Sequence, residues 1–284
     1  MLINKGDIVV RKSYKKDIVF RVEQILDDQQ GKQLPLLKGV NMRLVADAPV
    51  DDLMLYEKIT LEEQLKKILD KENSFLRSHI LKRGGNKRNF RSSSKNDFFD
   101  VPGHVLHIDG DEAYLQKCID AYTKLNIPVH GYWIPEKDMP EKIVDYILQH
   151  HPDIIVITGH DGLLKDKNDF TQIDNYRNSR YFVDTVKATR KICPNLDETV
   201  IFAGACQSHY EALIAAGANF ASSPKRVMIH AFDPVFIVEK VAYTSFKENP
   251  SITDIISGSI TGAEGIGGVE TRGKFRLGYP KSPY

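Results

Sequence analysis

The sequence predicts an α/β fold, in which a mostly parallel sheet is flanked by helices and preceded by a small β-barrel and a helix with a linker. Three observations predict it. From residue 101 onward, continuous apolar strands alternate with helical stretches. The first 56 residues carry short β-branched segments between turn residues. The segment between these two parts has one run of helical periodicity and then loses its apolar residues. The expected domains are therefore residues 1–56, 57–100 and 101–284.

Composition limits the classes of protein that this chain can belong to. The 284 residues are 42% hydrophobic and 27% charged, which is ordinary for a globular protein of two domains. The formal net charge is +1, which gives no general attraction to nucleic acid, so we expect none as the primary partner. No apolar run approaches the roughly 18 residues that span a membrane, and no signal peptide opens the chain. We therefore expect a cytoplasmic protein without membrane insertion.

The first part of the chain reads as a small barrel. Short strands are expected near residues 7–10, 17–22, 36–37 and 42–45, with turns around Gly6, residues 27–31 and Gly39. Several short strands in so few residues favour an SH3-like barrel. Two roles stay open, namely a binding module and a β-cap that stabilises the main domain.

A single amphipathic helix is expected next, over residues 60–82. Thr60 and Glu63 form a capping-box pattern, and apolar residues then recur at helical spacing. Residues 77–95 hold seven basic residues and no acidic one. Together with Gly84 and Gly85, this composition predicts a flexible basic linker.

The last part of the chain alternates strands and helices. The expected strands are residues 104–108, 128–133, 153–158, 199–203 and 226–230. The expected helices begin after Asp111 and at Pro140, and cover residues 179–191, 207–216 and 234–241. In sheets of this kind, sites form at the carboxyl ends of the strands.

Two of these strands end in reactive side chains. His160 follows the strand at 153–158, and Cys206 follows the strand at 199–203. If the strands are neighbours, both side chains meet at one edge of the sheet. A thiolate is the nucleophile in cysteine chemistry, and an imidazole can take its proton and return it to a leaving amine. Taken singly, a cysteine or histidine there is more often structural, and we assign Cys118 and Cys193 to that role.

The surroundings of Cys206 strengthen the pairing. A helix beginning at Gln207 would place the thiol near a helix N-terminus, where the partial positive charge favours the thiolate. Glycines beside both residues let the backbone approach a substrate and free N–H groups for an oxyanion hole. The cysteines lack zinc-ligand spacing and no dinucleotide loop is present, so we expect neither a metal nor a cofactor.

These strand ends resemble those of the caspase–clostripain–gingipain superfamily of cysteine peptidases, in which the histidine strand also precedes the cysteine strand. The closer resemblance is to the YabG-type sporulation peptidases of spore-forming Firmicutes, and it covers essentially the whole chain. The runs that carry it are residues 6–14, 107–115, 158–161, 202–209, 217–224 and 268–273.

The resemblance implies a caspase-like fold and a cytoplasmic peptidase of the mother cell. Its substrates would be proteins of the spore coat and cortex machinery, cleaved next to Arg or Lys. It makes Cys206 the nucleophile and His160 the general base. It also implies self-cleavage, which we expect in the basic linker at Arg91, Arg88 or Arg83. The oligomeric state is left open.

The sequence departs from the wider superfamily at two positions. Asp161 stands where a glycine commonly follows the histidine, so the oxyanion hole must use the backbone N–H of Asp161 or Gly162, together with that of Cys206. Gly204 stands where clostripain-type members place an aspartate that helps to bind the substrate arginine. A buried guanidinium needs a carboxylate partner. The candidates at nearby strand ends are Asp161, Asp109 and Asp233.

Two other functions remain open from the sequence. A class I amidotransferase also places a cysteine at a strand-to-helix turn, but its histidine follows the cysteine, as His209 and His230 do here. A non-enzymatic scaffold would instead use the barrel and the basic linker to bind anionic partners.

Overall fold

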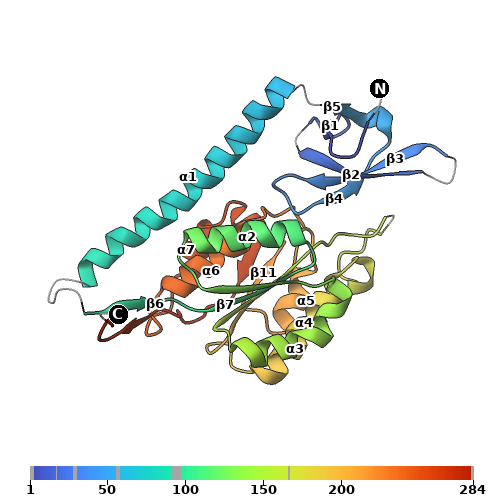
Figure 1. Ribbon diagram of the computed structural model, residues 1–284. Coiled ribbons are helices and arrows are strands. Elements are labelled where there is room, and N and C mark those ends of the chain that lie inside the picture. Colours follow the sequence, from blue (N-terminus) through green and yellow to red (C-terminus); the bar gives the residue numbers. More distant parts are fainter. Residues whose placement is uncertain are drawn as a thin grey trace. The chain divides into compact units, whose positions relative to one another are not determined.

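The computed structural model describes residues 3–16, 18–27, 31–55, 58–90, 97–165 and 167–282. The chain divides into two compact units, Met1–Phe75 and Leu76–Tyr284. None of the helices in the described ranges is long and apolar enough to cross a membrane. Figure 1 shows the elements along the chain.

The first unit holds a five-stranded antiparallel sheet. Its strands are β1 (Ile8–Arg11), β2 (Val19–Asp27), β3 (Gln33–Gly39), β4 (Val45–Asp47) and β5 (Leu53–Leu55), in the order β4-β3-β2-β1-β5. A 3₁₀-helix, Val50–Asp52, precedes β5. Alternate side chains such as Val9, Phe20 and Leu37 point into a buried apolar cluster, which is the period-two pattern of a sheet with one covered face.

Helix α1 runs from Lys58 to Phe90, so the linker prediction was wrong for residues 77–90. The basic composition suggested a flexible tether, but tertiary contacts hold the helix where its sequence alone is polar. Within the second unit, the His79 ring stacks on Phe236 and its Nδ1 lies 2.9 Å from Glu239. Arg83 donates to the carbonyl of Leu125. Residues 91–96 lie outside the described ranges.

The second unit is built on a six-stranded sheet. Its strands are β7 (Val105–Asp109), β8 (Val129–Trp133), β9 (Ile154–Thr158), β10 (Val200–Ala203), β11 (Phe220–Ser222) and β12 (Ile266–Gly268). Their order is β12-β11-β10-β9-β7-β8, and all pairs are parallel except that of β11 with β12. A short antiparallel pair, β6 (Phe99–Val101) and β13 (Arg276–Gly278), lies apart. The mostly parallel α/β sheet is thus confirmed.

Helices cover both faces of this sheet, as Figure 1 shows. They are α2 (Glu112–Lys124), α3 (Met139–His150), α4 (Ser179–Ile192), α5 (Tyr210–Ala215), α6 (Asp233–Tyr243) and α7 (Ile252–Ser257). Helices α3, α4 and α5 pack on one face, where Ile143, Phe182 and Leu213 join the buried strand residues Ile157 and Ile201 in one apolar core. Helices α2 and α6 pack on the other face.

Near the carboxyl edge, one expected strand was wrong, and one expected helix begins later than predicted. The expected strand at 226–230 is absent from the described fold because Ser223 and Arg226 adopt left-handed backbone angles, which break an extended chain. The strand in this region is β11, Phe220–Ser222, instead. Helix α5 begins at Tyr210 rather than at residue 207, because Gln207 is left-handed and the His209 ring accepts the N–H of Ala212 as the N-cap.

Candidate active site

The sheet brings the two expected reactive residues to equivalent positions on neighbouring strands. Strands β9 and β10 pair directly in parallel, and Ile157 lies opposite Ala203 at the end of the register. His160 and Cys206 each come three residues after these paired positions. Both residues therefore leave the sheet at the same carboxyl edge and at the same height, as the sequence predicted.

The backbone of His160 is held at both of its polar groups. Its N–H donates to Glu136 Oε1 at 2.8 Å. Its carbonyl accepts a hydrogen bond from the Asn178 side-chain amide at 2.8 Å. Residues from the β8–α3 and β9–α4 connections thus hold the strand end on both sides. These two bonds fix the position of the backbone that carries the imidazole.

The imidazole itself is oriented by a carboxylate that the sequence analysis did not assign. His160 Nε2 lies 2.8 Å from Asp111 Oδ2, and its ring meets the Tyr114 ring edge-on. The Asp111 and His160 side chains are 8% and 17% exposed, so this contact is largely shielded from water. His160 Nδ1 is buried and has no hydrogen-bond partner in the described part of the chain.

Asp111 is placed by the start of α2. Its Oδ1 accepts the backbone N–H groups of Ala113 and Tyr114, each at 3.0 Å, which makes it the N-cap of the helix. Its own N–H donates to Asp109 Oδ1 at 2.9 Å. The positive end of α2 favours the ionised carboxylate. An aspartate directly after a strand and before a helix was visible in the sequence, but its partner depends on β7 lying beside β9.

Cys206 lies in a tight turn and is 1% exposed. The N–H of Ile229 points to Cys206 Sγ at 3.3 Å. The thiol also donates to the carbonyl of Ile229 at 3.8 Å. The nearest helix, α5, begins four residues later at Tyr210, so the expected helix N-terminus does not act on this thiol. The N–H of Gln207 donates to the carbonyl of Val227 at 3.1 Å. This hydrogen bond holds residues 227–229 against the turn.

Asp161 does not offer an open carboxylate. Its Oδ1 accepts the N–H groups of Gly162 and Asn178, and its Oδ2 accepts the hydroxyls of Ser179 and Ser208. Burial raises the pKa of Asp161, while these donors pull it down. Because the side chain takes the N–H of Gly162, that donor is not free for an oxyanion hole. The N–H of Asp161 makes no hydrogen bond with a described residue.

The two other expected substrate carboxylates are also engaged by the chain itself. Asp233 accepts the N–H groups of His230, Ile260 and Thr261 and the Thr261 hydroxyl, and burial raises its pKa. Asp109 is fully buried between the Thr158 hydroxyl and the N–H of Asp111. Neither residue has the exposure that binding a substrate guanidinium requires.

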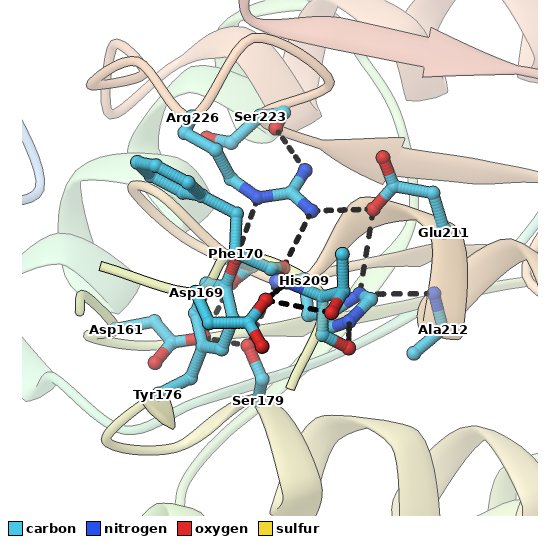
Figure 2. Close-up of polar contacts among 12 residues, drawn as sticks. Asp161, Asp169, Phe170, Tyr176, Ser179, His209, Glu211, Ala212, Ser223 and Arg226 are labelled. Carbon is cyan, nitrogen blue, oxygen red and sulfur yellow. Dashed lines mark hydrogen bonds and ion pairs between the residues drawn. The ribbon is translucent and has the colours of Figure 1, made fainter. Parts of the chain in front are cut away.

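Arg226 links several loops through its guanidinium, and Figure 2 shows these contacts. Arg226 donates to the Tyr176 hydroxyl, to the carbonyls of Ser223 and Phe170, and to the Glu211 carboxylate. These acceptors, from three segments, tie the β9–α4 connection and α5 to the turn after β11. The turn after β11 also holds the backbone of Gln207, because the N–H of Gln207 donates to Ser223 Oγ at 2.9 Å.

The histidines of the amidotransferase alternative have other roles. His209 Nδ1 caps α5, and its Nε2 lies 3.0 Å from the carbonyl of Thr171. His230 Nδ1 accepts the N–H of Phe232 at 3.1 Å. The rings of His209 and His230 are thus hydrogen-bonded to loop backbone, whereas His160 Nδ1 is buried without a hydrogen-bond partner in the described part of the chain.

The expected self-cleavage residues fall in or after α1. Arg83 lies in the helix, and its guanidinium stacks on the Tyr243 ring at 3.8 Å. A packed helical arginine is a poor cleavage site because proteolysis favours exposed, locally unfolded backbone. Arg88 lies in the last turn of the helix, and Arg91 lies outside the described residues. Among the described residues, no group of three metal-binding side chains is placed to hold a metal ion.

An α/β sheet that carries a thiol, an imidazole and a carboxylate at one carboxyl edge has the groups that a hydrolase uses. The family model described as YabG peptidase U57 matches residues 4–280, and this chain belongs to that family of peptidases. The chain is 43% identical over 284 residues to the sporulation-specific protease YabG of Bacillus subtilis (strain 168), and the alignment covers 97% of each protein. No solved structure matches the chain.

Proposed function

We propose that the protein is a cysteine endopeptidase in which Cys206 is the nucleophile, His160 the general base and Asp111 the residue that orients the imidazole. The observation that carries this proposal is the 2.8 Å contact between Asp111 Oδ2 and His160 Nε2. A carboxylate accepts a hydrogen bond, so it selects the tautomer with the proton on Nε2. The lone pair then lies on Nδ1, the nitrogen that can take a proton from a thiol.

The reaction follows from these roles. His160 Nδ1 takes the thiol proton, and Cys206 Sγ attacks the carbonyl carbon of the scissile peptide bond. The tetrahedral intermediate collapses, the carbon–nitrogen bond breaks and His160 returns the proton to the leaving amine. A water molecule, deprotonated by His160, then hydrolyses the thioester and releases the acid and the thiol. Asp111 stabilises the imidazolium that forms in both halves.

The oxyanion would be stabilised by backbone donors. The N–H of Asp161 is the remaining candidate beside His160, because the N–H of Gly162 is bonded to the Asp161 carboxylate. The second donor in this proposal is the N–H of Cys206, as the resemblance implies. Two N–H groups preorganised in this way contribute several kcal/mol of transition-state stabilisation in other peptidases, about 3 kcal/mol for each donor.

The substrates we propose are proteins of the spore coat and cortex machinery, cleaved next to Arg or Lys in the cytoplasm of the mother cell. The name of the Bacillus subtilis relative supports the role in sporulation. The family resemblance supports the substrates and the basic specificity. We also assign the β12-β11-β10-β9-β7-β8 sheet, with its histidine and cysteine strands adjacent, to a caspase-like fold. The first unit, with β5 paired to β1, is assigned to an SH3-like barrel.

The proposed nucleophile can be tested with a covalent probe. A peptide acyloxymethyl ketone with arginine at its reactive end alkylates a catalytic thiol in an active cysteine peptidase. Peptide mapping by mass spectrometry should place the label on Cys206 in the wild type, with Cys118 and Cys193 as internal references, and His160→Ala should suppress it. Equal labelling of all three cysteines, or equal labelling in both proteins, would overturn the assignment.

A further inference from the structure

We infer that Glu136 is the carboxylate that receives the basic side chain of the substrate, immediately before the scissile bond. This inference rests on the proposed peptidase function, and it names the residue that would give the enzyme its preference for basic side chains. Glu136 opens the short 3₁₀-helix Glu136–Asp138 between β8 and α3, and it was not among the residues that the sequence singled out.

The position of Glu136 places its carboxylate beside the proposed general base. Its Oε1 accepts the N–H of His160 at 2.8 Å. The carboxylate rests directly on the backbone of Gly110 and Gly159, where a Cβ atom at either glycine would overlap it. These glycines directly follow β7 and β9. Glu136 therefore reaches from the β8 side across two strand ends to the edge where the substrate must lie.

The charge of Glu136 has no counterion in the described part of the protein. No Lys, Arg or His of that part lies within ion-pair distance of it, and its Oε2 accepts no hydrogen bond there. Glu136 is half-buried, so water solvates its carboxylate only in part. A partly dehydrated carboxylate gains when a cation binds it. A substrate Arg or Lys supplies that cation.

The other candidate carboxylates already accept hydrogen bonds from the protein itself. Asp109 and Asp111 are bonded within the β7–α2 turn, Asp161 accepts four hydrogen bonds, and Asp233 accepts four more. Displacing such donors would leave several buried N–H and hydroxyl groups unpaired, which is costly. Among these carboxylates and Glu136, only Glu136 keeps an oxygen open.

An exposed aromatic ring lies beside Gly110. Trp133 ends β8, is 56% exposed, and donates its indole N–H to the carbonyl of Gly110 at 3.2 Å. The indole is thereby held next to the strand end on which the Glu136 carboxylate rests. A guanidinium can bond to a carboxylate and stack on an aromatic face at once, and an ammonium gains less from stacking. This pairing favours arginine over lysine.

The test compares two fluorogenic peptides that differ only in the residue before the scissile bond, arginine in one and its neutral isostere citrulline in the other. The wild type should prefer the arginine peptide in kcat/KM. Glu136→Gln keeps an acceptor for the N–H of His160 and the same bulk over the glycines, but it loses the charge. We expect it to lower the arginine-to-citrulline ratio of kcat/KM by about 100-fold. Glu141→Gln, at an exposed position in the first turn of α3, should leave the ratio unchanged.

The outcomes separate this inference from the function on which it rests. If the wild type cleaves neither peptide faster than Cys206→Ala does, the peptidase proposal falls and the inference with it. If the wild type cleaves in a Cys206-dependent way but Glu136→Gln keeps the arginine preference, only the inference falls. An equal loss on both peptides would show that Glu136 merely supports His160, and it also overturns the inference. Thermal unfolding checks that each variant folds, and Glu136→Asp, which keeps the charge, should retain part of the preference.

Discussion

Ser208 donates a hydrogen bond to Asp161 Oδ2 across 2.8 Å, and this bond joins the two turns that carry the proposed catalytic pair. Asp161 directly follows His160, and Ser208 comes two residues after Cys206. The backbone of Ala205 is tied into the same contact, because its N–H donates to Ser208 Oγ at 2.9 Å. One buried hydroxyl thus links the two turns, in addition to the direct pairing of β9 with β10.

Removing that hydroxyl should weaken both the fold and the reaction. Ser208→Ala leaves Asp161 short of one donor and the N–H of Ala205 without its acceptor. We expect a loss of about 1–3 kcal/mol in the free energy of unfolding, measured by urea denaturation. We also expect a fall of about 10-fold or more in kcat/KM on the arginine peptide. Ser257→Ala, at an exposed position on α7, serves as the control. Equal effects of the two substitutions would contradict the account.

The Asp111→Asn variant tests the orientation of the imidazole. Asparagine can still cap α2 through its side-chain oxygen, but it loses the negative charge beside His160. We expect kcat/KM to fall by about 100-fold or more because the imidazolium is less stabilised and the tautomer is no longer selected. The loss should lie mainly in kcat, with KM changed little. An unchanged rate would remove Asp111 from the mechanism.

Three histidines form a cluster at the opposite end of the sheet, and we expect them to make stability depend on pH. The His130 ring lies 3.9 Å from that of His150 and 4.9 Å from that of His104. Burial, and then the charge of His130, lower the pKa of both His104 and His150, while Asp153 partly opposes this at His104. The unfolded chain therefore binds more protons than the folded chain just below the ordinary histidine pKa of about 6.5.

Stability should accordingly fall as the pH drops from about 7.5 through 6.5 toward the lowered folded-state values. His130→Gln removes the neighbouring charge, so it should flatten this dependence. The measurement is the urea midpoint at several pH values. His151→Asn is the control, since His151 is exposed and its left-handed backbone suits asparagine. Parallel curves for the wild type and His130→Gln would contradict the role of the cluster.

Self-cleavage remains a prediction, and we now place it at the end of α1. Arg83 is packed against Tyr243, so Arg91 and Arg88 are the stronger sites. Wild-type protein should convert on incubation to two fragments that intact mass assigns to a cut after one of them. Cys206→Ala should stay whole. Arg88→Ala combined with Arg91→Ala should stay whole as well, although it still cleaves the arginine peptide. Fragments of the same masses from Cys206→Ala would show that another protease makes the cut.

The sequence predicted the sheet best where its strands are continuously apolar. Strands β9 and β10 are buried along their whole length, so the period of the pattern and the reactive residues after it were both visible. Strand β11 was missed because it has only three residues, the last of them Ser222, and β12 was missed because two of its residues are glycines. In both cases the neighbouring strand, not local propensity, makes the extended chain stable.

The candidate site was predicted in its two reactive residues but not in the residues that support them. Nothing in the spacing of Asp111 or Glu136 indicates that either reaches His160, because each contact crosses from another strand of the sheet. Of the carboxylates proposed for the substrate, Asp109 ends β7 and Asp161 follows β9, as expected, but Asp233 begins α6 and follows no strand. Their burial and their hydrogen bonds, which the sequence does not reveal, leave them bonded to the protein itself.

The measurement that tests the central claim most directly is cleavage of a mixed protein substrate by the wild type, Cys206→Ala and His160→Ala, with the cut sites identified by mass spectrometry. The account predicts that only the wild type cuts, and that Arg or Lys precedes each cut. Equal cutting by Cys206→Ala, or silence of the wild type on Arg- and Lys-containing proteins, would contradict it.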